Sequence, residues 1–147
     1  MNPDLQGRVL PPAPAYLVGR EKVREFARAT GSTSALSLDP EAARAAGHAD
    51  VVAPPTFPVV VQEATLAQLL AEPDAGIDFS RVVHGEQRFR YSRPVVAGDE
   101  LTATLTVTSV KSLGGNSMVT AESTIVDATG AHVVTATSTL VVRAEES

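Results

Sequence analysis

Apolar and polar residues alternate with a period of two through most of the segment 81–143. In the stretch 101–107 four apolar side chains alternate with threonines, and the stretch 132–143 repeats this pattern. Such alternation is typical of half-buried strands, whose solvent face suits threonine. Turn residues separate the alternating stretches at 97–99, 114–116 and 127–130. Because short turns join consecutive strands, and a short apolar piece at 15–18 adds a further one, the pattern predicts an antiparallel sheet of about five strands.

The same alternation assigns a face to His84, which lies at the start of a predicted strand. It places His84 on the polar face, opposite Phe89, together with the charged residues Glu86, Arg88 and Arg90. Three interpretations of His84 stay open: a hydrogen-bonded structural histidine, a residue that lines a substrate channel, and a catalytic residue. The other two histidines, His48 and His132, closely follow glycines and are predicted to be exposed in loops.

The N-terminal half follows a helical period instead. Apolar residues at i, i+3, i+4 and i+7 predict a helix over the segment 20–31, and a polar, serine-rich loop follows at 32–38. Asp39 suits the cap of a compact second helix over the segment 39–47. The segment 56–71 is apolar almost all the way round, which predicts a buried helix. A buried helix that precedes an antiparallel sheet predicts an α+β fold in which the sheet wraps around a long central helix.

The composition narrows the range of functions. With 147 residues the chain has the size of one domain, which we assign to residues 1–147. Its 12 lysines and arginines against 17 aspartates and glutamates give a net charge of −5, which argues against nucleic-acid binding. The absence of cysteine excludes disulfides, thiolate metal sites and a cysteine nucleophile. With three scattered histidines as well, neither a metal nor a cofactor is predicted.

The location of the protein is also constrained. No apolar run is long enough to span a bilayer, and no signal peptide is recognisable. We therefore expect a cytoplasmic protein without a membrane partner.

Several segments together resemble the MaoC-like hydratase and dehydratase superfamily, whose members have the hot-dog fold. The resemblance extends over nearly the whole chain and is carried by the segments 16–27, 53–57, 84–89 and 93–99. They include Ala53-Pro54-Pro55-Thr56-Phe57, His84-Gly85-Glu86-Gln87 and Arg93-Pro94-Val95 followed by Ala97-Gly98-Asp99. The chain is most similar to the HadA-type subunits of actinobacterial (3R)-hydroxyacyl-ACP dehydratases. The His-Gly-Glu-Gln stretch also resembles the non-catalytic half of double-hot-dog enoyl-CoA hydratases. The resemblance implies a single hot-dog domain.

Catalytic members of the superfamily carry an aspartate and a histidine in a loop after the first helix. This pair acts on the water that is added to, or removed from, the β-carbon of a thioester. When that motif is aligned from the preceding segment 29–31, Ser32 takes the place of the aspartate and Ser37 that of the histidine. Serine is no base near neutral pH, and neither serine has an adjacent histidine in the sequence to activate it. The resemblance therefore implies no catalytic residue in this chain.

By the same resemblance, the chain is expected to be a HadA-like subunit that holds the acyl chain, while a MaoC-like, HadB-like partner supplies the aspartate and histidine. The reaction would be the reversible dehydration of a (3R)-hydroxyacyl thioester on acyl carrier protein or coenzyme A, as in fatty acid biosynthesis. The isolated chain would be an inactive lyase subunit that is able to form a homodimer. Substrate-binding residues are expected to be Phe57, Val60, Val61, His84 and Gln87.

Other interpretations stay open. Glu63 lies in the central apolar helix, where some hot-dog thioesterases place a carboxylate. With His84 it would make the chain a stand-alone acyl-thioesterase, unless Glu63 lies on a solvent-facing stripe of the helix. A third alternative is a non-enzymatic homodimer that binds acyl thioesters. The basic residues Arg88, Arg90 and Arg93 either attract an acidic carrier or pair with neighbouring carboxylates such as Glu86 and Asp99.

Overall fold

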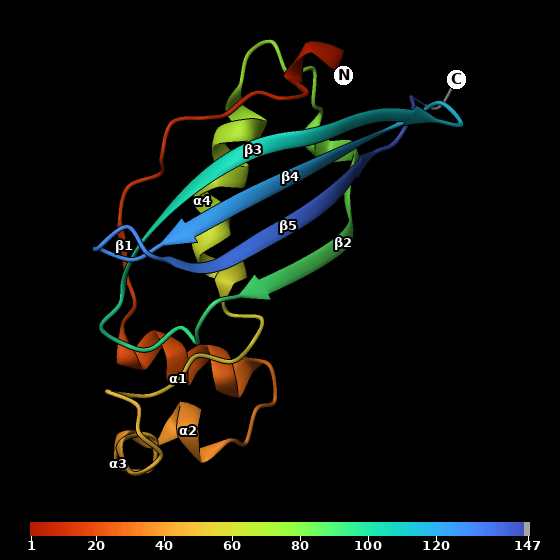
Figure 1. Cartoon of the computed structure of the whole chain (residues 1–147). Helices are drawn as coiled ribbons and strands as arrows, with labels where there is room; N and C mark the ends of the chain where they lie inside the picture. The colour runs from red at the N-terminus through yellow and green to blue at the C-terminus, as the bar shows by residue number, and fades with distance from the viewer. Residues whose placement is uncertain (146–147) are drawn as a thin grey trace.

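The computed structural model describes residues 1–145, which form a curled antiparallel sheet against a long helix (Figure 1). Within these residues the strands are β1 (Tyr16–Leu17), β2 (Val82–Tyr91), β3 (Glu100–Leu113), β4 (Asn116–Val126) and β5 (His132–Val142). Their order across the sheet is β1-β3-β4-β5-β2. The predicted α+β class, with an antiparallel sheet around one long helix, is confirmed. The second strand of the chain, β2, pairs with the last strand, β5, and forms the edge of the sheet opposite β1.

The long helix α4 (Pro58–Ala71) packs one of its faces against the sheet (Figure 1). The buried residues of this face follow the three- and four-residue spacing of one helix side: Pro58, Val61, Gln62, Thr65 and Leu69. Glu63 and Ala64 on other sides of the helix are exposed. The prediction that this helix is buried almost all the way round is therefore wrong, because the sheet covers only one face.

Short helices gather near the beginning of α4 (Figure 1). They are α1 (Arg20–Ala29), α2 (Ala35–Leu38) and α3 (Pro40–Ala45). As predicted, Asp39 caps α3, since its carboxylate accepts a hydrogen bond from the Glu41 backbone N–H at 3.0 Å. In contrast, α2 lies in the segment predicted as a loop, because a single helical turn is too short to give a periodic pattern. The ring of Phe26 on α1 meets the edge of the Phe57 ring at 5.3 Å between centroids and joins α1 to the core.

The register of β2 against β5 shifts by one residue at Gly85. On the two sides of this bulge, His84 lies opposite Leu140 and Gln87 opposite Ser138. Leu140 and Ser138 are both buried, so His84 and Gln87 share the helix-facing side of the sheet. The prediction that His84 lies on the polar face is therefore wrong, because an extra residue in a strand moves all residues before it to the opposite face.

An N-terminal arm, residues 7–14, runs along the outer edge of β3 (Figure 1). Backbone N–H groups of the arm donate to three carbonyls of β3: Gly7 to Val107 at 2.8 Å, and Leu10 to Leu105 and Ala13 to Ala103 at 2.9 Å each. The two residues of β1 continue this pairing along the same edge. At the opposite side of the sheet, β2 has no strand partner within residues 1–145 other than β5.

Candidate functional site

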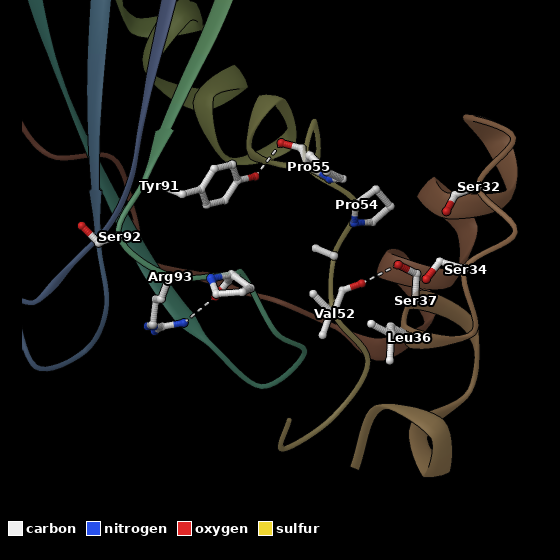
Figure 2. A pocket seen from close by; sticks show the side chains of 12 residues that line it. Ser32, Ser34, Leu36, Ser37, Val52, Pro54, Pro55, Tyr91, Ser92 and Arg93 are labelled. Atoms are coloured by element: carbon white, nitrogen blue, oxygen red, sulfur yellow. Dashed lines mark hydrogen bonds between the residues drawn. The ribbon is translucent and has the colours of Figure 1, made fainter. Parts of the chain in front are cut away.

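A cavity of about 500 Å³ opens between the short helices and the end of β2 (Figure 2). One wall comes from the segment 32–37, and the opposite wall comes from residues 91–94. The segment 52–55, which leads into α4, lies between the two walls. We call this the serine cavity, because its lining includes Ser32, Ser34, Ser37 and Ser92.

The two positions aligned with the catalytic pair both line the serine cavity. Ser37 is only 5 % exposed, and its hydroxyl donates a hydrogen bond to the Val52 carbonyl at 2.6 Å. The Val52 N–H in turn donates to the Leu36 carbonyl at 2.8 Å, so this contact fastens α2 to the segment before α4. Among the described residues that line the cavity, none is Asp, Glu or His. The lining therefore offers neither a carboxylate nor an imidazole as a general base.

Tyr91 and Arg93 set the electrostatics of the opposite wall. The Tyr91 hydroxyl donates to the Pro55 carbonyl at 2.5 Å, and partial burial raises the pKa of Tyr91 to about 12 (Figure 2). Tyr91 thus keeps its proton at neutral pH and acts as a hydrogen-bond donor. The Arg93 guanidinium contacts Asp99 at 2.8 Å and Asp127 at 3.2 Å. The hydrogen bonds that Arg93 donates, first of all those to Asp99, raise the pKa of Arg93 above its ordinary value.

Of the three basic residues Arg88, Arg90 and Arg93, two contact carboxylates. In addition to the Arg93 contacts, Arg88 lies 2.7 Å from Glu86. This agrees with the interpretation in which the arginines pair with neighbouring acids.

A serine–histidine contact was missed by the sequence analysis. Ser92 Oγ lies 2.5 Å from His132 Nδ1, and His132 Nε2 lies 2.7 Å from Thr135 Oγ1. The prediction that His132 is an exposed loop residue is wrong, since it is half-buried at the first position of β5. However, the Ser92 hydroxyl points away from the serine cavity (Figure 2). The contact joins the end of β2 to β5, and no pattern in the sequence links residues 40 positions apart.

A second cavity, of about 440 Å³, lies between α4 and the first half of β2. Most of its lining is apolar and comes from Val59, Leu66, Leu70, Phe79, Val82 and Leu140. The remaining lining is polar and consists of Gln62, Glu63, His84 and Gln87. We call this the helix–strand cavity. It brings together three residues that the sequence analysis singled out: Glu63, His84 and Gln87.

A buried and a half-buried amide side chain, Gln62 and Gln87, contribute to the polar side of the helix–strand cavity. Gln62 is 1 % exposed, and its amide nitrogen donates to the Ala136 carbonyl at 3.0 Å. The amide nitrogen of Gln87 donates to Gln62 Oε1 at 3.0 Å. The Ser138 hydroxyl lies 2.6 Å from Gln87 Oε1 and 3.1 Å from Gln62 Oε1. We call Gln62, Gln87 and Ser138 the amide cluster; it joins α4, β2 and β5.

The sequence analysis did not identify Gln62 or Ser138. The available signal was the spacing of Gln62 with Thr65 and Leu69, which places this polar residue on the face that packs against the sheet.

The other predicted substrate-binding residues lie in the hydrophobic core. Phe57 is fully buried, Val61 is 4 % exposed, and Val60 packs against the same core. Phe57, Val60 and Val61 do not belong to the described lining of either cavity. Their assignment to substrate binding, like that of His84 and Gln87, stays a prediction.

Residues 1–145 contain no group of three or more His, Asp or Glu side chains placed to hold a metal ion. In the same part of the chain, no helix combines the length and the apolar character needed to cross a membrane.

Residues 6–136 match the family described as FAS1-like, dehydratase domain region. The chain belongs to this family. Over 147 residues it is 76 % identical to a UPF0336 protein of Clavibacter michiganensis subsp. michiganensis, and the match covers 100 % of this chain and 99 % of that protein. The resemblance drawn from the sequence segments is thus confirmed at the level of the dehydratase region.

Solved structures extend this result to the fold. A chain in the crystal structure of the C-terminally truncated HadBC (3R-hydroxyacyl-ACP dehydratase) complex from Mycobacterium tuberculosis has a TM-score of 0.86 and 31 % identity, with 96 % of this chain and 99 % of that chain covered. A MaoC-like dehydratase has a TM-score of 0.83 and 33 % identity, with 95 % of this chain but 42 % of that chain covered. This member of the FAS1-like dehydratase family has the hot-dog fold of MaoC-like dehydratases.

Proposed function

We propose that this chain is a HadA-like, non-catalytic subunit of a (3R)-hydroxyacyl-thioester dehydratase. The observation that carries the proposal is the lining of the serine cavity. The sequence alignment places Ser32 and Ser37 at the positions of the catalytic aspartate and histidine. Both serines line this cavity, and the Ser37 hydroxyl donates to the Val52 carbonyl. Without a carboxylate or imidazole among its described lining residues, this cavity lacks the acid and base that the reaction requires.

The free edge of β2 supports a partner subunit. Phe79, Val83 and Tyr91 lie on or beside this strand and are 71 %, 46 % and 37 % exposed. Beyond β5, the described residues supply no further strand to cover β2. An open strand edge with exposed apolar side chains is a template for pairing with another chain. We assign this edge to a MaoC-like catalytic partner, whose sheet continues across β2.

The length of a similar protein gives a second reason. This chain spans 42 % of the MaoC-like dehydratase that is 33 % identical to it. More than half of that protein has no counterpart here. A chain of the HadBC complex is instead matched over 99 % of its length, which supports an assembly of this chain with a second one.

The proposed reaction needs two proton transfers. A base removes a proton from the α-carbon of the thioester, the C–O bond at the β-carbon breaks, and the hydroxyl leaves as water after an acid protonates it. The aspartate and histidine of the partner perform both transfers. This chain contributes the surface that holds the acyl thioester, carried by acyl carrier protein or coenzyme A, beside them.

Reconstitution tests the proposal. The chain is purified alone and together with a MaoC-like catalytic subunit, and hydration of a trans-2-enoyl thioester is followed by the loss of absorbance of the conjugated double bond. We expect activity in the mixture and none in either subunit alone. A mixture in which the partner's catalytic histidine is replaced serves as the control and stays inactive. Hydration by the isolated chain would contradict the assignment.

A second candidate function is thioester hydrolysis, which is favoured by Glu63 and His84 lining the same cavity. In this reaction water attacks the thioester carbonyl, with a carboxylate as base, and the thiol leaves. The same purified chain is assayed for thiol release. Hydrolysis that is lost in Glu63→Gln would favour this candidate. Binding of acyl thioesters without either activity would instead favour a non-enzymatic homodimer.

A further inference from the structure

We infer that His84 is a substrate-contacting residue which this chain adds to the active site of the complex, where its imidazole donates a hydrogen bond to an oxygen of the bound acyl thioester. The inference rests on the proposed function, because the reaction itself needs the catalytic partner. It goes beyond that function by naming the residue through which the non-catalytic subunit takes part in specificity.

The first step of the argument is the bulge at Gly85, which determines where His84 lies. His84 is opposite Leu140, on the helix-facing side of the sheet, only because Gly85 is an extra residue in β2. A Cβ atom at Gly85 would lie 3.3 Å from Val141 Cγ2 and 3.4 Å from the Thr139 carbonyl oxygen. There is little room for a larger residue, so glycine suits the bulge at this position.

The second step is the surroundings of His84. It lines the helix–strand cavity together with Glu63 and two members of the amide cluster, Gln62 and Gln87. The rest of the lining is apolar and comes from α4, β2, β5 and Phe79. A cavity that is mostly apolar but has a few polar groups suits a ligand with a long apolar part and a small polar group, such as an acyl chain that ends in a thioester.

The third step is the position of the two cavities along β2. The serine cavity includes Tyr91 at the C-terminal end of the strand, and the helix–strand cavity includes Val82 and His84 at its N-terminal end. A partner of the same fold that pairs along β2 about a two-fold axis runs antiparallel to it. Its own counterpart of the serine cavity, with the aspartate and histidine, then lies beside the helix–strand cavity of this chain. One substrate can therefore contact both the catalytic pair of the partner and His84.

The test uses the reconstituted complex and steady-state kinetics with an enoyl thioester. In His84→Leu we expect kcat/KM to fall about tenfold, mainly through a higher KM, because a hydrogen bond to the bound substrate is lost. His84→Gln keeps an N–H donor and is expected to recover most of this loss. His48→Leu, the same substitution at a histidine outside both cavities, is the control and leaves the kinetics unchanged; His48 is half-buried, whereas His84 is exposed.

Deletion of Gly85 tests the role of the bulge. It returns His84 to the outer face, so we expect a loss like that of His84→Leu, and no additional loss when the two changes are combined. Size-exclusion chromatography verifies that each variant still forms the complex. Unchanged kinetics in His84→Leu would overturn the inference about His84 but leave the proposed function intact. Loss of activity in that variant together with loss of the complex would also overturn it, since His84 would then be an interface residue. An inactive wild-type mixture would overturn the proposed function and the inference with it.

Discussion

Ser37 is aligned with a catalytic histidine by the resemblance drawn from the sequence, but its contacts in the structure are structural. Its hydroxyl is buried and donates to the Val52 carbonyl, which fastens α2 to the segment that leads into α4. The replacement of the catalytic pair by Ser32 and Ser37 stays a prediction from the alignment of the sequence segments. The acceptor of the Ser37 hydroxyl could not be predicted, because Val52 lies 15 residues away and nothing in either segment indicates that they meet.

A first prediction concerns this hydrogen bond. Ser37→Ala should lower the free energy of unfolding by about 1 kcal/mol, since the carbonyl of the half-buried Val52 loses its donor. The same variant should leave the hydration rate of the reconstituted complex unchanged. Urea denaturation and the hydration assay measure the two effects. Ser34→Ala is the control for stability, because Ser34 precedes the same short helix, α2, and its side chain makes no capping hydrogen bond. An activity loss in Ser37→Ala would assign Ser37 to the chemistry instead.

At the scale of elements, periodicity identified α1, α4 and the strands β2 to β5, because each of these repeats a face over several residues. The helix α3 was predicted from its cap residue Asp39, and β1 from a short apolar piece of sequence. It failed at Gly85, because a one-residue bulge reverses the faces of a strand and leaves the composition unchanged. It also failed on the buried face of α4. Apolar residues lie on several sides of this helix, whereas the side that packs against the sheet includes the polar residues Gln62 and Thr65.

The polar contacts of α4 give a second prediction. Gln62→Leu should lower the free energy of unfolding by about 2 kcal/mol, because the half-buried Gln87 side chain, the buried Ser138 side chain and the Ala136 carbonyl lose a partner. Gln68→Leu is the matched control on the same helix. Gln68 Oε1 is buried without a hydrogen-bond partner among the described residues, so its removal should be neutral or stabilising. Equal losses in the two variants, measured by urea denaturation, would contradict the role of the amide cluster.

At the scale of the molecule, two carboxylates fasten segments that are distant in sequence. Asp50 receives hydrogen bonds from the Arg20 guanidinium, which ties the segment before α4 to α1 and lowers the pKa of Asp50 to about 2. Asp127 accepts a hydrogen bond from the Thr129 hydroxyl and another from Arg93, and its pKa is also lowered to about 2. The fold therefore favours the charged form of both carboxyl groups.

These pKa values predict how acid affects the protein. A carboxyl group whose pKa is lower in the folded than in the unfolded chain stabilises the fold at pH values above its unfolded pKa of about 4. That contribution is lost as the pH falls from about 4 to about 2, where protonation breaks the contacts. We expect the urea midpoint to fall over this range, and to fall less steeply in Asp127→Asn than in the wild type. Equal acid sensitivity of the two proteins would contradict this explanation.

The assembly of the two cavities from distant segments could not be predicted from the sequence. The serine cavity is assembled from the segments 32–37, 52–55 and 91–94, and the helix–strand cavity from α4, β2 and β5. Each element could be predicted from its own pattern. Their meeting depends on the curl of the sheet and on the pairing of β2 with β5, for which the local sequence carries no signal.

The N-terminal arm has a consequence for how many chains can join. Its backbone bonds cover the outer edge of β3, and Pro11, Pro12 and Pro14 have no N–H to offer to a further strand. One edge of the sheet is thus occupied by the chain itself, while the β2 edge is open to a partner. A subunit with two open edges would propagate into a filament, whereas a subunit with one open edge ends growth after a single pairing. Under the proposed pairing along β2, the arm therefore limits edge pairing to two chains.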